Sequence, residues 1–184
     1  MDINQLIHFL RNNFYHHESL IYFADFLRLQ GRFTEAADFL DRCLYAFEAS
    51  FSFDFKIVSA KDAGSEAASF KPSIEMDLSE QCEGLNKVFC ECLVKYVDIL
   101  GRKGCNRTAM EFCKLLLGLK PKEDPFGVLL RFDYYCIRAK EYQAYISFVR
   151  QFCQEVHQCG SLAVCMPNSL LSCGLAKHSM EPEG

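Results

Sequence analysis

Apolar residues recur at helical spacing along most of the chain. In residues 109–117, Ala109, Phe112, Cys113, Leu116 and Leu117 follow the series i, i+3, i+4, i+7 and i+8, which is typical of an amphipathic helix. A single helix cannot bury such a stripe by itself. The pattern therefore predicts one member of a packed helix pair.

Polar and helix-breaking residues mark the two ends of this predicted helix. Asn106 and Thr108 precede the stripe, and their side-chain oxygens can accept hydrogen bonds from the free N–H groups of a first turn. Lys120 suits the negative end of the helix dipole, and Pro121 cannot continue a helix. The helix is thus predicted to lie between these signals.

A glycine followed five residues later by alanine occurs twice, as Gly31 with Ala36 and as Gly104 with Ala109. Each glycine stands between two apolar stripes. Glycine makes a tight turn without a steric penalty, and alanine lets two helices approach closely, so each copy predicts a helical hairpin. The first hairpin carries Leu20, Phe23, Ala24 and Leu27, then Ala36, Phe39, Leu40, Cys43, Leu44 and Phe47; the second carries Phe89, Leu93, Tyr96, Val97 and Leu100 before the stripe already described.

A third pair follows without a turn glycine. Asp124 is the predicted N-cap, and Pro125 is predicted at the first helical position. The inward stripe consists of Leu129, Phe132, Cys136, Tyr145, Phe148, Val149 and Phe152. Residues 1–12 predict a short leading helix with Ile3, Leu6, Ile7 and Leu10 inward.

These patterns predict an all-α fold of antiparallel helical hairpins. Their spacing fits the tetratricopeptide frame of roughly 34 residues, so we expect a short right-handed superhelical array. One long loop, residues 51–82, interrupts the array, with an extended piece near 51–58 and an aperiodic stretch at 59–73. The expected repeat domain covers residues 1–158, and residues 159–184 are predicted to form a linker and the start of a further, truncated helix.

Composition and charge narrow the function classes. The chain has 184 residues, 17 Phe, 8 Tyr and a formal net charge of −4, which favours a sizeable core and argues against a general nucleic-acid binder. Residues 1–30 lack a signal-peptide pattern, and no apolar run reaches the roughly 18 residues of a membrane span. We expect a protein without membrane contact, in the cytoplasm, with the nucleus as a second location.

The 11 cysteines permit two interpretations. Cys43, Cys113, Cys136 and Cys153 fall on apolar stripes, where a reduced thiol behaves as a small hydrophobe. The alternative is a zinc site drawn from Cys90, Cys92, Cys153, His157, Cys159 and Cys165, although no CxxC pair occurs and the spacings match no standard zinc knuckle. We favour core thiols and predict no metal ligand.

No recognisable catalytic motif occurs. A Gly-rich phosphate loop, a nucleophile elbow, a paired-carboxylate motif and an HExxH string are all absent from the sequence, and His16 and His17 are adjacent, which suits a surface pair better than joint chelation. We therefore expect no catalytic residues, no cofactor and no enzyme activity. An unrecognised thiol or metal enzyme is kept as a rival class.

Arg102, Lys103 and Arg107 cluster at the second predicted turn. They are the candidate partner-binding residues, because long basic side chains beside a rigid hairpin can reach an acidic partner or a phosphate. The alternative is that Arg102 and Lys103 are solvated and complement the C-terminal end of a helix dipole.

Three segments resemble the transcription factor 25 family, whose fungal member is ribosome quality control complex subunit 1. The segment "GRKGCNRTAMEFCKLLLGLKPKEDPFGVLLRFDYYCIRAKEYQAYI" resembles the family's Gly-Cys-x-Arg-Thr-Ala turn, Cys-Lys-Leu-Leu helix, Asp-Pro pair and Arg-x-x-x-Tyr segment. "NNFYHHESLIYFADFLRLQGRFTEAADFLDRCLYAFEASF" resembles its first helix pair, and "MPNSLLSCGLAKHS" resembles its later Leu-Pro-Asn helix start. The matching residues are Arg42, Leu44, Tyr45, Phe47, Glu48, Gly104, Cys105, Arg107, Thr108, Ala109, Cys113, Lys114, Leu115, Leu116, Asp124, Pro125, Arg138 and Tyr142.

The resemblance implies a non-catalytic adaptor of the ribosome-associated quality control complex. Its implied partners are the 60S ribosomal subunit, a RING ubiquitin ligase and ubiquitin, and its implied role is to support ubiquitination of nascent chains on stalled 60S subunits. The family's charged, low-complexity N-terminal region has no counterpart here. The same resemblance carries an alternative, a nuclear transcription cofactor or repressor that acts through protein–protein contacts.

Overall fold

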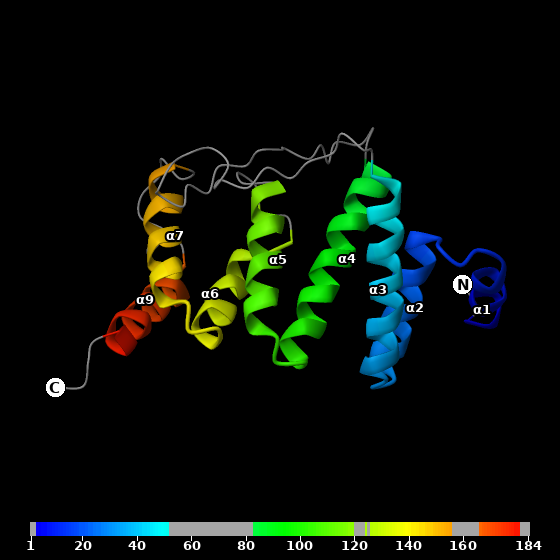
Figure 1. Cartoon of the computed structure of the whole chain (residues 1–184), viewed down its shortest axis with the longest axis horizontal. Coiled ribbons are helices and arrows are strands. Elements are labelled where there is room, and N and C mark those ends of the chain that lie inside the picture. Colours follow the sequence, from blue (N-terminus) through cyan, green and yellow to red (C-terminus); the bar gives the residue numbers. More distant parts are fainter. Residues whose placement is uncertain (1–2, 52–82, 120–123, 125, 156–165, 181–184) are drawn as a thin grey trace. The chain divides into compact units, whose positions relative to one another are not determined.

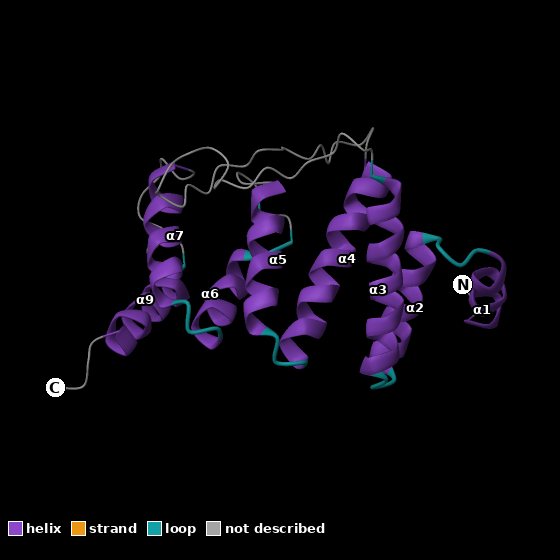
Figure 2. Ribbon diagram, viewed as in Figure 1, coloured by secondary structure: helices purple, strands orange, loops and turns teal. Residues whose placement is uncertain are grey.

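The computed structural model describes residues 3–51, 83–119, 124, 126–155 and 166–180. Within these ranges the chain forms eight helices and no strand (Figure 2), which confirms the all-α prediction for the described residues. The helices are α1 (Ile3–Asn12), α2 (His17–Leu29), α3 (Phe33–Ser50), α4 (Glu83–Arg102), α5 (Asn106–Leu119), α6 (Leu129–Arg138), α7 (Tyr142–Glu155) and α9 (Pro167–Met180). Apart from Phe51, the predicted extended piece and loop at 51–82 lie outside the described residues.

The described helices divide into two compact units. One contains α1 to α4, and the other contains α5, α6, α7 and α9. The second predicted hairpin joins α4 to α5, which belong to different units, so its packing stays a prediction. The boundary predicted at residue 158 also stays a prediction.

In the first unit, α2, α3 and α4 lie side by side (Figure 1). The predicted stripes supply the core: Leu20, Ala24, Leu27, Ala36, Leu40, Cys43, Phe47, Phe89, Leu93, Val97 and Leu100 are all buried. Aromatic rings join the helices, because Phe23 meets Phe39 with ring centroids 4.7 Å apart and Phe47 meets Phe89 at 5.1 Å. Of the four residues predicted to face inward on the leading helix, Leu6 and Leu10 are buried, and Ile3 and Ile7 are half-buried.

In the second unit, α6 packs against α5, α7 and α9. Its core also follows the predicted stripes, with Ala109, Cys113, Leu116, Leu117, Phe132, Cys136, Tyr145 and Phe148 buried. The rings of Phe132 and Phe148 meet edge to face with centroids 4.5 Å apart, a preferred aromatic geometry. In the third predicted pair, Phe132, Cys136, Tyr145 and Phe148 are therefore inward as predicted, Leu129 and Val149 are half-buried, and the side chain of Phe152 lies outside the described residues.

A buried carboxylate attaches α9 to α6. Asp133, only 8% exposed, accepts hydrogen bonds from Ser172 Oγ at 2.9 Å and from Asn168 Nδ2 at 3.3 Å. The Tyr145 hydroxyl of α7 donates to the Ser169 carbonyl at 3.4 Å. Small residues of α9, including Ser169 and Ala176, lie on its buried side, so polar contacts rather than large apolar side chains fix this helix.

Two predicted helix starts need correction. α6 begins at Leu129 with Val128 as its N-cap residue, because a turn with Gly127 at φ 62° intervenes, so the predictions of Asp124 as N-cap and of residue 125 as the first helical position were wrong. The Asp124 carboxylate still accepts the N–H groups of Val128 and Leu129 from outside the helix, each at 2.8 Å. At α5, the Asn106 amide nitrogen donates back to the Gly104 carbonyl at 3.2 Å, and its Oδ1 has no partner among the described residues. The prediction that Asn106 Oδ1 caps this helix was therefore wrong.

The helix turns share one backbone geometry even where glycine is missing. Gly31 and Gly104 have φ angles of 77° and 79°, and Lys140, between α6 and α7, has a φ angle of 59°. At Gly31 and at Lys140, the N–H of the positive-φ residue donates three residues back (3.0 and 3.1 Å), and the next N–H donates five residues back (2.9 and 3.0 Å). The third pair thus makes the glycine type of turn with a lysine.

Replacing Lys140 with glycine is expected to raise the free energy of unfolding by about 0.5–1 kcal/mol, because glycine adopts this φ without the Cβ penalty. Replacing Gly31 with alanine should lower it by about 1 kcal/mol. A Cβ there would meet no heavy atom within 4 Å, so this cost comes from the backbone angle alone. Urea unfolding of both variants measures whether each substitution raises or lowers the free energy of unfolding. A destabilised Lys140→Gly protein would contradict the proposed role of Lys140 in the turn.

Among the described residues, no helix combines the length and apolar character needed to cross a bilayer.

Candidate partner-binding surface

The three predicted basic residues have separate surroundings. Arg102 ends α4 in the first unit, where its guanidinium carbon lies 4.2 Å from the centroid of the Phe33 ring. Lys103 follows it and is exposed. Arg107 belongs to α5 in the second unit, and its Nη2 lies 3.0 Å from Glu141 Oε1. We therefore consider Arg102 and Lys103 separately from Arg107.

Phe33 brings the α2–α3 turn into the candidate surface. The turn exposes Leu29 (89% exposed) and part of Phe33 (36% exposed), and Arg32 between them bonds Glu35, with Nε 2.6 Å from Oε1. We call Leu29, Arg32, Phe33, Arg102 and Lys103 together the turn surface. Sequence analysis missed its first three members because Phe33 and Arg102 are far apart in the chain and meet only through tertiary packing.

A group of four alternating charges positions α2 against α4. Lys95 Nζ lies 2.7 Å from Asp25 Oδ2, and Arg28 Nη1 lies 3.5 Å from Asp98 Oδ2. Arg28 also approaches Asp25, at 3.9 Å. Because these side chains are about a fifth to a third exposed, each pair is worth only up to about 1 kcal/mol. Their main effect is positional, because Arg28 precedes Leu29 and Asp98 lies one turn before Arg102.

Seven cysteines whose side chains the structure describes form no disulfide: Cys43, Cys90, Cys92, Cys105, Cys113, Cys136 and Cys173. Burial, and then the charge of Glu91, raises the pKa of Cys90 to about 11. The pKa of Cys92 is also raised, first by its hydrogen bond with Cys43 and then by burial. A thiol acts as a nucleophile or metal ligand in its thiolate form, so both side chains suit a core role.

The zinc alternative is only partly within the described structure. Cys90 and Cys92 are buried on α4, whereas the side chains of Cys153, His157, Cys159 and Cys165 lie outside the described residues. In the part of the chain that the structure describes, no three His, Cys, Asp or Glu side chains are arranged to hold a metal ion.

The two adjacent histidines differ. His16 is the exposed N-cap of α2, and its Nδ1 accepts from the Ser19 N–H at 3.3 Å. His17 is half-buried, with its ring centroid 4.0 Å from that of Phe47. Burial lowers the pKa of His17, with smaller contributions from the Ala46 backbone, which opposes the shift, and from His16. The surface interpretation therefore fits His16, and His17 belongs to the α2–α3 packing.

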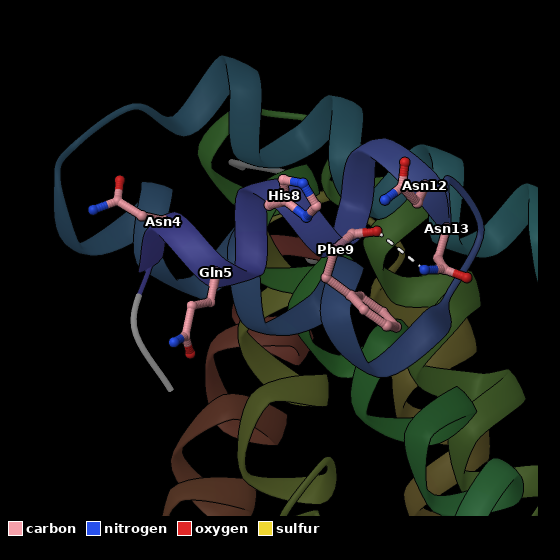
Figure 3. Close-up of a pocket in the computed structure, with 6 residues that line it drawn as sticks. All are labelled: Asn4, Gln5, His8, Phe9, Asn12 and Asn13. Carbon is pink, nitrogen blue, oxygen red and sulfur yellow. Dashed lines mark hydrogen bonds between the residues drawn. The ribbon is translucent and has the colours of Figure 1, made fainter.

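A hollow of ≈ 520 Å³ lies against α1 (Figure 3). Its lining residues are Asn4, Gln5, His8, Phe9, Asn12 and Asn13. Four of the six side chains are amides, and the Asn13 amide donates to the Phe9 carbonyl at 3.2 Å. These residues include no carboxylate or thiol, so the hollow lacks the paired groups of an acid–base or nucleophilic site.

A second exposed apolar feature is on α9. Leu170, Leu171 and Leu175 are 55%, 76% and 53% exposed, and they lie on the side away from the small buried residues. Helix α9 therefore has apolar side chains on its open face as well as small ones on its packed face.

The described residues form an all-helical structure that exposes basic and apolar side chains on helix turns and helix faces. Comparison with known proteins gives the family. The model of the family described as "Transcriptional repressor TCF25" matches residues 1–183, so the chain belongs to this family.

Curated relatives support this assignment. The human protein named "Ribosome quality control complex subunit TCF25" is 31% identical over 158 residues, covering 86% of this chain and 21% of the relative. The Dictyostelium discoideum protein of the same name is 28% identical over 183 residues, covering 99% of this chain and 22% of the relative. An Ampulloclitocybe clavipes protein named "Probable transcription factor claV" is 30% identical over 125 residues, covering 68% of this chain and 14% of the relative.

The chain thus spans about a fifth of the length of the first two of these relatives. No solved structure matches it.

Proposed function

We propose that this chain is a non-catalytic scaffold of a ribosome quality control complex. The supporting observation is its 31% identity, over 86% of its length, to a protein named as a subunit of such a complex. In this proposal the hairpins form a tetratricopeptide-like, right-handed superhelical array that holds partners on its exposed turns and faces. The protein acts in the cytoplasm on stalled 60S subunits and supports ubiquitination of nascent chains by a RING ligase.

A scaffold suits the chemistry of the described residues. The exposed side chains proposed to bind partners belong to packed helices. Because the backbone of a packed helix is already ordered, it loses little conformational entropy when a partner binds. The partners proposed are the 60S subunit, a RING ligase and ubiquitin, without general nucleic-acid binding. Arg102, Lys103 and Arg107 are the proposed contact residues.

The alternative is a nuclear transcription cofactor that acts through protein contacts. Two observations favour keeping it: the family description names a transcriptional repressor, and one relative is named as a probable transcription factor. A nuclear role would require contacts with nuclear proteins instead of stalled 60S subunits.

Co-sedimentation tests the proposal. The tagged full chain, expressed in cells whose translation has been stalled, is expected to sediment with 60S subunits on a sucrose gradient and to be much less abundant there without the stall. Recovery of the chain only in free and nuclear fractions would contradict the ribosomal role and favour the transcription alternative.

The basic residues are tested in the same gradient by neutral substitutions made separately in the two units. Arg102→Gln with Lys103→Gln, and Arg107→Gln alone, are each expected to reduce 60S recovery roughly threefold or more at low salt. The difference from the wild-type chain should shrink at higher salt, because salt screens the contact that the substitution removes. Glutamine is used at Arg107 because glutamate would place a second carboxylate beside Glu141. Arg11→Gln with Lys87→Gln, both exposed in the first unit, is the charge-matched control. Equal recovery of all chains would favour the solvated helix-end interpretation.

A further inference from the structure

The turn surface exposes groups that folding does not require. Leu29 is the most exposed large apolar side chain among the described residues, at 89%, although it lies in the last turn of a helix that buries Leu20 and Leu27 completely or nearly so. Leaving a leucine in water forfeits the stabilisation that its burial would give. Single exposed leucines are common, so Leu29 becomes informative through its neighbours.

The charges beside Leu29 are unevenly paired. Arg28 and Arg32 each have a carboxylate partner, Asp98 and Glu35 respectively. Arg102 instead lies over the Phe33 ring, and neither Arg102 nor Lys103 forms an ion pair within the described part of the chain. The turn surface therefore presents two cations without carboxylate partners, beside two apolar side chains.

The contact with Phe33 holds Arg102 in place without occupying its N–H donors. A guanidinium above an aromatic ring keeps its edge available, and that edge can donate two parallel hydrogen bonds to a carboxylate. Arg28 lies next to Leu29 on α2, and Asp98 lies one turn before Arg102 on α4, so the ion pair between Arg28 and Asp98 fixes the backbone on both sides. Binding to Arg102 would thus lose less side-chain entropy than binding to an unsupported arginine.

We infer that the turn surface docks an acidic protein segment that carries an apolar side chain next to its carboxylates. The carboxylates pair with Arg102 and Lys103, and the apolar side chain covers Leu29 and the open edge of Phe33. RNA fits less well, because a phosphate backbone offers no apolar group to cover an exposed leucine. The inference rests on the proposed scaffold function and names the chemistry of one partner segment.

Fluorescence anisotropy with the full chain tests this docking. The first probe is a short synthetic peptide in which glutamates alternate with leucines; the second has serines in place of the leucines; the third is a single-stranded RNA. The glutamate–leucine peptide is expected to bind most tightly. Leu29→Ser and Arg102→Gln should each weaken its binding by about fivefold or more, the effect of truncating a hot-spot side chain.

The other end of α4 provides matched controls. Leu85 is 63% exposed and Lys87 is exposed, so Leu85→Ser and Lys87→Gln remove the same chemical groups away from the turn surface. Both should change peptide affinity by less than about twofold. All four substituted side chains are at the surface, and circular dichroism verifies that each variant is folded.

Several results would overturn the inference: no measurable binding of the glutamate–leucine peptide, equal binding of the serine peptide, tighter binding of the RNA, or equal effects of turn-surface and control substitutions. The 60S gradient separates this failure from failure of the proposed function. If the chain sediments with stalled 60S subunits but shows no selective peptide binding, the proposed function stands and the docking surface is rejected. If the chain binds the peptide selectively but does not associate with 60S subunits, the docking surface stands and the ribosomal role is rejected.

Discussion

Replacing Ala36 with leucine is expected to lower the free energy of unfolding by about 1–3 kcal/mol, because a larger side chain overpacks a closed core. Ala36 is 0% exposed and lies in the first turn of α3, where that helix packs against α2. Ala109 of α5 is also 0% exposed, and Ala109→Leu should cost a similar amount. Thermal and urea unfolding followed by circular dichroism measure both effects.

Ala49→Leu provides the control, since Ala49 lies on the exposed side of α3. It should change stability by less than about 0.5 kcal/mol. Unchanged midpoints for both Ala36→Leu and Ala109→Leu would reject the hairpin alignment that made these alanines the points of close approach.

Replacing Asp133 with alanine is expected to destabilise the second unit by about 1–3 kcal/mol and to loosen α9 selectively, because two part-buried donors lose their shared acceptor. The substitution removes the acceptor shared by Asn168 and Ser172. Hydrogen exchange should therefore show faster amide exchange in α9 than in the wild-type chain, with α2 and α3 in the first unit unchanged.

Asp133→Asn separates the acceptor from the charge. Asparagine keeps one carbonyl oxygen, so its α9 exchange should fall between those of the wild type and Asp133→Ala. Asp38→Ala, at an exposed position of α3, should leave α9 exchange unchanged. Equal α9 protection in the wild type and Asp133→Ala would show that the hydrogen bonds do not hold this helix.

Helical periodicity predicted most of the fold because burial and spacing act over short stretches of sequence. The apolar stripes that contain Leu20, Ala36 and Phe132 could each be predicted from the spacing within a single helix, and these three residues are buried. The late start of α6 was missed because the Asp124 carboxylate reaches over a turn to bond N–H groups at the start of a helix that begins further on. Lys140 gave no turn signal because lysine rarely adopts a positive φ.

The site depends on contacts between distant positions, and no single-sequence pattern reports those. Arg102, Lys103 and Arg107 are neighbours in sequence, yet Arg102 meets Phe33 and Arg107 meets Glu141. Asp133 was likewise not predicted as a helix attachment, because its partners Asn168 and Ser172 follow more than thirty residues later. Which neighbour each polar group has is decided by tertiary packing.

The alternating charges between α2 and α4 also restrict how these helices can align. Asp25 faces Lys95, and Arg28 faces Asp98, while Glu91 and Arg102 lie on α4 about one turn before and one turn after these partners. Sliding α4 by one turn in one direction would oppose Asp25 with Asp98 and Arg28 with Arg102; sliding it the other way would oppose Asp25 with Glu91 and Arg28 with Lys95. Either shift brings like charges together, so these modest ion pairs give the first unit a register that its apolar side chains, which repeat every turn, would specify only weakly.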